Sequence, residues 1–248
     1  MSVLYLAWRQ PGHRWWPIGR LARQGSEFEF VYTRGAIEAE GAGFRPLLAF
    51  PERNDVYRSG TLFPVFANRE MNTSRPEFQS YISWLALPST ETDPLALLAR
   101  SGGRRETDVF EVFARPEPTE DGRYRMPFFV HGLRHRSEAA QALVERLAPG
   151  EALELRPDPE NPADAEALAV FARSTHVGFA PRYLRRDLRA LDLANTGPGA
   201  ISVTRVNLAP TPMQFRVLAA YEAPWPEGFR PFAGPEFEPL RPDLAAVA

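Results

Sequence analysis

The chain of 248 residues contains no cysteine, no lysine and only four histidines. Without cysteine it can form neither disulfides nor thiolate metal sites, which fits a reducing compartment, and we expect a cytoplasmic protein. The histidines, which are His13, His131, His135 and His176, lack the spacing of a metal site. We therefore expect neither a metal ion nor another cofactor.

Long apolar runs are also absent. No segment reaches the roughly 18 apolar residues of a membrane span, and the N-terminal apolar stretch is too short for a signal peptide. We expect no membrane partner. Hydrophobic residues make up 44% of the chain and charged residues 24%, which is typical of a globular protein with one large or two modest domains.

The charge balance excludes a general nucleic-acid coat protein, because 29 arginines face 31 acidic residues and the net charge is −2. Exclusive use of arginine fits either biased codon usage or bidentate contacts to phosphate. The segment 126–222 holds eleven arginines and eleven acids, so its net charge is zero. Any DNA contact must therefore be local and geometric, with a small footprint.

The first part of the chain predicts an α+β domain over residues 1–115. Alternating apolar residues predict strands over Val3–Trp8, Ile18–Ala22, Glu27–Thr33 and Arg45–Phe50. Helices are expected over Leu62–Glu70, Pro76–Leu87 and Pro94–Arg100, the last with Asp93 as its N-cap. The proline-rich and acidic residues 116–125 form the predicted linker.

The second part, residues 126–222, predicts several strands with two helices, which suits a small β-barrel. Ser137 caps the first expected helix, Glu138–Leu147, and Pro181 opens the second, which runs to about Leu193. Strands are expected over Phe128–Gly132, Ala152–Arg156, Leu168–Ala172, His176–Phe179, Ala200–Asn207 and Gln214–Tyr221. The remaining residues, 223–248, form a proline-rich tail that we expect to be extended or disordered.

The most informative segment is the loop Asp158-Pro-Glu-Asn-Pro-Ala-Asp164 between two apolar runs. Together with GLRHR before it and Val-Gly-Phe-Ala-Pro-Arg after it, this loop resembles the HIRAN domain from about Met126 to Tyr221. The resemblance implies a small β-barrel that binds DNA. In that family a pocket holds the 3′ end of single-stranded DNA by base stacking, by an aspartate on the 3′-hydroxyl and by basic residues on phosphates.

The resemblance assigns roles to particular residues. It implies that Arg134 contacts phosphate, that His135 and Phe179 occupy aromatic positions of the pocket, and that Asp164 binds the 3′-hydroxyl. Asn161 is the other polar member of the loop, and Arg182 is a basic residue beyond Phe179. The expected DNA-binding set is completed by Arg186, which the helical spacing places on one face with Arg182 and Arg189.

One departure weakens the resemblance. Ala163 stands where the DNA-end binders have a stacking tyrosine, and this loses about 1–3 kcal/mol of base stacking. The residues also allow other interpretations: Asn161 and Asp164 are common turn formers, and Arg186 fits a solvated helix face. Asp158 with Asp164 or Glu160 could hold Mg²⁺, but the prolines between them favour a turn.

The N-terminal part has a looser similarity. Short strands followed by YRSGTLFPVFANREM and DPLALLARSGG resemble the N-terminal region of HipA-type proteins, between Arg58 and Gly103. No glycine-rich phosphate loop and no kinase-like body accompany it. We expect this domain to be a scaffold that docks a partner, or alternatively a second DNA-contacting surface.

These observations predict a non-catalytic DNA-binding protein that prefers single-stranded DNA or 3′ ends, in DNA repair or defence. Its partners would be DNA and a separately encoded DNA-processing enzyme. No nucleophile–base pair is visible in the sequence, so we expect no enzymatic activity. The alternative is a protein–protein interaction adaptor with a degenerate nucleic-acid pocket.

Overall fold

The computed structural model describes residues 3–10, 15–105, 108–195, 197 and 199–241. The fold is mixed α+β, with two antiparallel sheets. The chain divides into two compact units that interleave in sequence. The first unit comprises Met1–Gln79, Thr90–Arg115 and Ala233–Ala248, and the second comprises Ser80–Ser89 and Pro116–Phe232.

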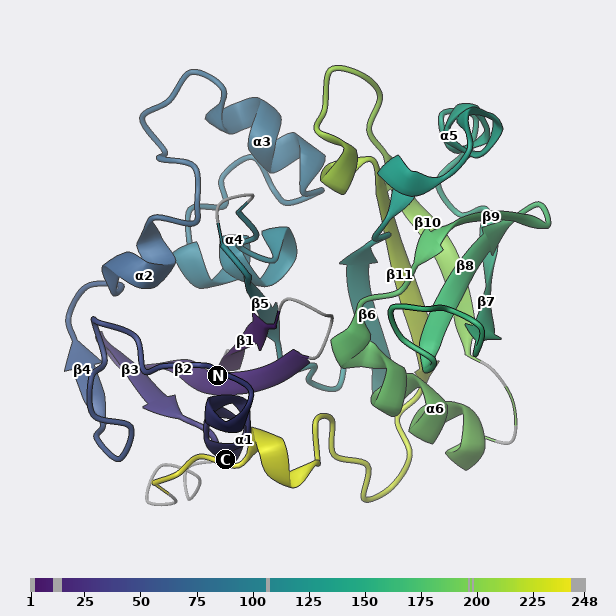
Figure 1. Ribbon diagram of the computed structural model, residues 1–248. Helices are drawn as coiled ribbons and strands as arrows, with labels where there is room; N and C mark the ends of the chain where they lie inside the picture. The colour runs from purple at the N-terminus through teal and green to yellow at the C-terminus, as the bar shows by residue number, and fades with distance from the viewer. Residues whose placement is uncertain (1–2, 11–14, 106–107, 196, 198, 242–248) are drawn as a thin grey trace. The chain divides into compact units, whose positions relative to one another are not determined.

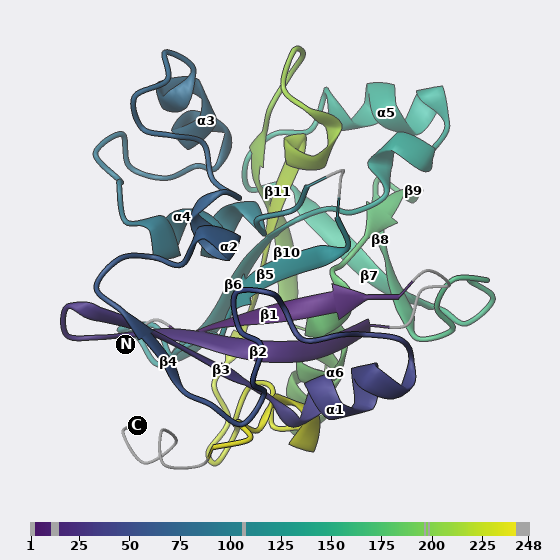
Figure 2. The same cartoon turned by 60° about the vertical axis from the view of Figure 1, so that its left-hand side comes forward.

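The first unit is built on a five-stranded sheet (Figure 2). Its order is β4-β3-β2-β1-β5, with β1 (Val3–Arg9), β2 (Trp15–Gln24), β3 (Glu27–Tyr32), β4 (Tyr57–Ser59) and β5 (Phe110–Ala114). The helices of this unit are α1 (Arg34–Gly41), α2 (Pro64–Ala67) and α4 (Pro94–Ser101), whereas α3 (Phe78–Trp84) begins in this unit and continues in the segment Ser80–Ser89 of the second. As predicted, Asp93 caps α4 by accepting from the Leu95 N–H at 3.2 Å.

The strand predicted over Arg45–Phe50 is wrong, and the hydroxyl of Tyr32 provides the reason. This hydroxyl accepts from the Leu47 N–H at 2.7 Å and donates to the Phe50 carbonyl at 2.9 Å. A buried side chain therefore satisfies the backbone of the segment, which forms a loop instead of a strand. The helix α1, which was not predicted, precedes this loop and buries Ala36 and Ala39.

The proline-rich tail is packed over its described part, contrary to the expectation of an extended or disordered segment. In the first unit, the ring of Phe237 meets those of Tyr5 and Phe113 with centroids 5.1 and 6.4 Å apart. Pro239 forms a bridge with Thr33. Buried aromatic residues between the prolines thus hold this segment in place, which its proline content did not suggest. Residues 242–248 of the predicted tail lie outside the described residues.

The second unit contains a six-stranded sheet of order β6-β11-β10-β7-β8-β9. Its strands are β6 (Arg123–Phe129), β7 (Ala152–Asp158), β8 (Ala167–Ala172), β9 (Thr175–Phe179), β10 (Ala200–Val206) and β11 (Val217–Pro224). The first three residues of β6 come from the predicted linker. The described residues of this unit show an isolated bridge from His131 to Phe179 and no ladder from β6 to β9, so the barrel stays a prediction.

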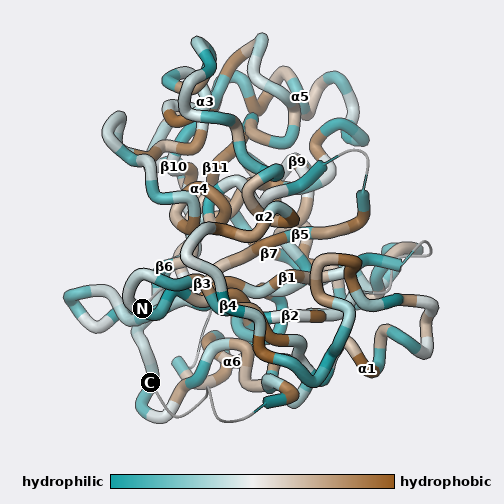
Figure 3. The backbone as a smooth tube through the Cα atoms, turned by 90° about the vertical axis from the view of Figure 1, so that its left-hand side faces the viewer, coloured by the Kyte–Doolittle hydropathy of each residue, from teal (hydrophilic) through white to brown (hydrophobic). Residues whose placement is uncertain are grey.

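Helices lie at opposite ends of this second sheet (Figure 1). Ser137 caps α5 (Glu138–Val144), as predicted, by accepting from the Ala140 N–H at 3.3 Å. At the other end, α6 (Arg185–Ala194) buries Leu188 and Leu191. Colouring by hydropathy shows much of the hydrophobic character on the strands and hydrophilic residues at loop tips (Figure 3).

A buried carboxyl on α6 fastens the chain that leaves β11. Asp187 is only 5% exposed, and its two oxygens accept from the Phe232 N–H at 3.1 and 3.2 Å. Burial raises the pKa of Asp187 to about 7, against the opposing effect of the bond from Phe232. Upstream in the same segment, Phe229 meets the ring of Tyr124 edge-on.

This raised pKa predicts how stability depends on pH. The folded protein holds the Asp187 proton more tightly than the unfolded chain, whose pKa is near 3.8. The stabilisation by the protonated carboxyl is therefore complete below about pH 4 and is lost as the pH rises toward about 7, by about 1.4 kcal/mol per pH unit. We expect Asp187→Asn to flatten this dependence, because an uncharged amide oxygen can still accept from Phe232.

Urea unfolding at about pH 5 and about pH 7 measures the effect. Glu145→Gln is the matched control, because this side chain is 53% exposed. The same pH slope in wild type and Asp187→Asn would show that the buried carboxyl does not cause it.

Candidate nucleic-acid interface

The register of three strands brings the motif residues to one end of the second sheet. The proline loop joins Asp158 at the end of β7 to Ala167 at the start of β8, and these two residues pair. Phe179, the last residue of β9, pairs with Ala169 two residues into β8. The bridge from Phe179 to His131 adds the segment that carries Arg134. The loop, the end of β9 and residues 131–136 therefore converge.

Glycine in the Val-Gly-Phe motif permits this convergence. Gly178 has a φ of 155°, and a Cβ there would overlap the carbonyl oxygen of His131 and Cγ1 of Val130. With no side chain in the way, Phe179 and His131 exchange two backbone hydrogen bonds, each of 2.9 Å. The close approach explains why only glycine suits this position.

Within the proline loop, Asn161 holds the backbone turn. Its amide oxygen accepts from the Ala163 N–H at 3.0 Å, and its Nδ2 donates to Asp158 at 3.3 Å. This is the turn-forming interpretation that the sequence left open.

Asp164 holds the loop to the helical segment that follows β9. Its carboxylate is 12% exposed and accepts from Nη1 of Arg185, which lies 2.6 Å from both oxygens. Nε of Arg182 lies 3.1 Å from the same carboxylate, and Nη2 of Arg182 donates to the Ala163 carbonyl at 2.8 Å. Two arginines therefore surround the residue to which the resemblance assigned the 3′-hydroxyl.

The arginines that meet the loop include Arg185, which was not predicted, beside Arg182 and Arg189. Residues Arg182–Leu184 form the 3₁₀ turn η2 before α6 begins at Arg185. Because a 3₁₀ turn has three residues, Arg185 follows Arg182 on the same side. Arg189 reaches the Glu166 carbonyl at 3.2 Å from that side, whereas Arg186 is exposed. The place of Arg186 on this face stays a prediction.

A row of half-buried rings runs along β8 and β9. Phe171 and His176 are paired across the strands and stack with centroids 5.1 Å apart. His176 meets Phe179 edge-on at 4.8 Å. The guanidinium of Arg156 lies 4.1 Å from the centroid of Phe171, and that of Arg136 lies 5.4 Å from the centroid of Phe179. Of these five residues the sequence argument assigned only Phe179.

Arg134 and His135 lie in the 3₁₀ turn η1 (Leu133–His135), which directly follows the bridge residue His131 and Gly132. Both side chains are exposed, and Nε of Arg134 donates to Nε2 of His135 at 3.0 Å. The pair is therefore accessible to a ligand at the same end of the sheet as Phe179.

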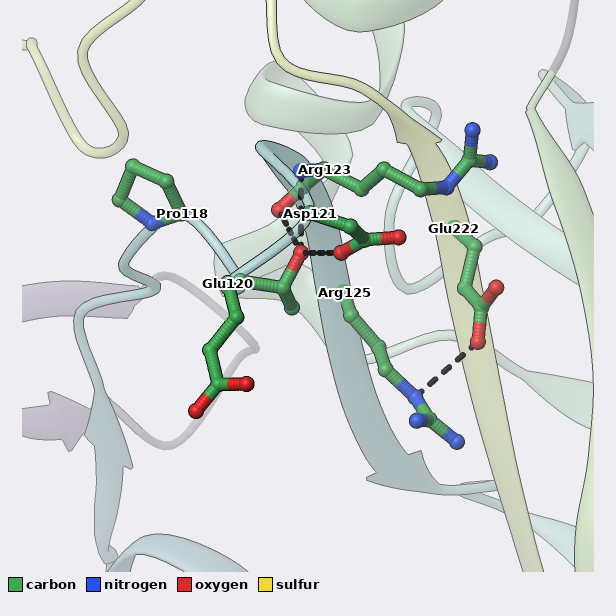
Figure 4. Close-up of a pocket in the computed structure, with 7 residues that line it drawn as sticks. Pro118, Glu120, Asp121, Arg123, Arg125 and Glu222 are labelled. Atoms are coloured by element: carbon green, nitrogen blue, oxygen red, sulfur yellow. Dashed lines mark hydrogen bonds and ion pairs between the residues drawn. The ribbon is translucent and has the colours of Figure 1, made fainter.

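An open hollow at the start of β6 lies apart from this site (Figure 4). There Arg125 pairs with Glu222 at 3.0 Å, and Thr119 donates to Asp121 at 2.6 Å. This hydrogen bond from Thr119 lowers the pKa of Asp121. The far end of β6 is about 20 Å away, since a strand rises about 3.4 Å per residue, so the hollow does not contain the motif residues.

The described residues contain no group of three or more histidine, aspartate or glutamate side chains arranged to hold a metal ion. None of their helices is both long enough and apolar enough to cross a membrane.

Comparison with known proteins identifies one part of the chain. Residues 124–207 match the HIRAN domain family. This family is generally a DNA-binding module, consistent with a nucleic-acid-binding role. No curated protein and no solved structure matches the chain. The match ends before β11, and the resemblance of the N-terminal part to HipA-type proteins stays a prediction.

The close approach at Gly178 leads to a stability prediction. We expect Gly178→Ala to lower the free energy of unfolding by at least about 2 kcal/mol, because the added methyl group collides with the His131 backbone. Gly150→Ala is the matched control, because Gly150 also has a positive φ of 84° but no atom lies within 4 Å of its Cβ position. Its loss should be only about 1 kcal/mol. Equal losses in urea unfolding would contradict the collision.

Proposed function

We propose that the second unit binds single-stranded DNA, with a preference for a 3′ end, and performs no chemistry of its own. The observation that carries the proposal is the convergence of the proline loop, Phe179 and the Arg134–His135 pair at one end of the sheet. The family match of residues 124–207 supports it.

Each group in this region suits one part of a single strand. Rings such as Phe179 and His135 can stack on bases of any sequence, for about 1–3 kcal/mol per base. Arg134 is exposed and has no carboxylate partner among the described residues, so it can contact a phosphate. Because the segment has no net charge, affinity must come from these few contacts.

The preference for a 3′ end would come from Asp164. A carboxylate offers about four acceptor sites, and Arg185, Arg182 and the Glu166 N–H already contact both oxygens of Asp164, so a 3′-hydroxyl would have to displace one of these donors. A terminal phosphate would meet like charge, although Arg182 and Arg185 offset part of that repulsion. The discrimination should therefore be modest, and Ala163 adds no stacking platform to it.

A separately encoded DNA-processing enzyme would supply the chemistry in this proposal, with the first unit as the docking part. The motif residues contain stacking, acceptor and cationic groups but no activated nucleophile. A pull-down that recovers no nuclease, helicase or similar enzyme would count against this extension.

The adaptor alternative also has a specific observation in its favour. Asp164 is held by two arginines, and Ala163 cannot stack on a base, so the pocket is poorer than the family pattern implies. In that case the loop contacts would serve only to fix the fold.

The proposal predicts tighter binding of a strand that ends in a 3′-hydroxyl than of one that ends in a 3′-phosphate, by about 3- to 10-fold at fixed salt. Fluorescence anisotropy with short 5′-labelled strands measures the ratio. Asp164→Ala should abolish the preference. Glu166→Ala is the matched control, because Glu166 also pairs with Arg185 but is 51% exposed.

Thermal unfolding of both variants shows whether the loop survives, since Asp164→Ala also releases Arg182 and Arg185. Equal affinity for both ends would leave general strand binding without end recognition. If neither strand binds, the adaptor becomes the better account.

A further inference from the structure

We infer that Arg136, positioned by His176 and Phe179, forms a binding site for a backbone phosphate of the DNA strand beside the proline loop. This inference rests on the proposed function and deepens it, because it assigns a residue that the motif comparison does not assign.

Arg136 shares with Arg134 the lack of a carboxylate partner in the part of the chain that the structure describes. Ion pairs of 2.6–3.6 Å hold several other arginines of this unit, which are Arg156, Arg173, Arg182, Arg185, Arg189 and Arg216. Among the described residues Arg136 makes no ion pair, and its buried Nε has no hydrogen-bond partner. Because Nε is closed to solvent, an anion would have to bind at the other N–H donors of this unpaired cation.

Two contacts nevertheless hold the guanidinium in place. Nη1 of Arg136 lies 3.1 Å from Nδ1 of His176, and the group lies over the ring of Phe179. Nε2 of His176 lies 2.9 Å from the Gly178 carbonyl, which can only accept, so Nε2 carries the hydrogen. Nδ1 is then the acceptor for Arg136.

This arrangement fixes the charge of Arg136 without neutralising it. Burial, followed by the neighbouring Arg136, lowers the pKa of His176, while the hydrogen bond with Gly178 and the charge of Asp158 raise it. With Nε2 donating to Gly178 and Nδ1 accepting from the guanidinium, the ring has the hydrogen-bond pattern of a neutral imidazole. A carboxylate in that position would have cancelled the positive charge instead.

The location selects the backbone of a single strand as the anion. Arg136 lies two residues beyond Arg134, and its guanidinium lies over one face of Phe179, which leaves the opposite face of that ring for the base that the proposed function stacks there. A guanidinium has five N–H donors in a planar fork, of which His176 uses one. The remaining donors can bind two phosphate oxygens next to that base.

Salt dependence separates a phosphate contact from a packing role. For single strands, each phosphate contact contributes about 0.7 to the slope of log K against log salt. We expect Arg136→Gln to reduce this slope by about 0.7 and to weaken binding of an oligothymidylate of about 12 nucleotides by about 10-fold or more. Arg156→Gln, the matched control, should leave the slope unchanged, because Glu154 already pairs with Arg156.

His176 is tested as a positioning residue. His176→Phe keeps a ring against Phe171 but removes the acceptor for Arg136. We expect weaker binding than in wild type, partial rescue by His176→Gln, and no further loss when His176→Phe is added to Arg136→Gln. Additive losses would show that His176 does not act through Arg136.

The remaining outcomes are distinct. If wild type binds no strand, both this inference and the proposed function fail. If wild type binds but Arg136→Gln has the same slope of log K against log salt as wild type, only the inference fails. It also fails alone if Arg156→Gln lowers that slope as much as Arg136→Gln does. Should Arg136→Gln not fold, Arg136→Lys provides the second test: it must retain the slope while weakening binding several-fold, because lysine keeps the charge without the planar fork.

Discussion

The site of the second unit depends on one backbone contact, the bridge between His131 and Phe179. Gly178 allows the two chains to approach, and the bridge joins the last strand, β9, to the residues that follow β6. Because η1 begins two residues after His131, the bridge also sets the position of Arg134 and Arg136 relative to Phe179. The glycine of the Val-Gly-aromatic motif is therefore needed to assemble the site, because the bridge that it permits positions Arg134 and Arg136 as well as the aromatic ring.

Around this bridge, charge is arranged in two ways. Arg182 and Arg185 both pair with the Asp164 carboxylate. These ion pairs hold the loop against the start of α6, and they offset part of the positive charge of the two arginines. Arg136 instead donates a hydrogen bond to the neutral imidazole of His176, which leaves its positive charge unpaired. A segment with no net charge can still present a local cation when its carboxylates form ion pairs with other arginines. This distribution suits a small footprint on DNA better than a broad electrostatic field does.

Local patterns in the sequence predicted much of the fold. Alternating apolar residues located the first three strands, and the caps Asp93 and Ser137 were identified correctly because capping involves neighbours in the chain. The errors have long-range causes. The Tyr32 hydroxyl satisfies the backbone of residues 47 and 50, and Phe237 finds a ring partner in Tyr5, more than 200 residues earlier. Neither contact leaves a periodic signal in its own segment.

The site residues divide in the same way. The motif identified Asn161, Asp164, Phe179 and Arg182. It could not show that arginines pair with Asp164, because the position of Arg185 depends on the 3₁₀ turn before it. His176 and Arg136 lie 40 residues apart, and only the pairing of β8 with β9 and the bridge to His131 bring them together. A binding surface made of cross-strand neighbours is visible only once register is known, because a shift of one residue would turn Phe171 to the opposite face of the sheet.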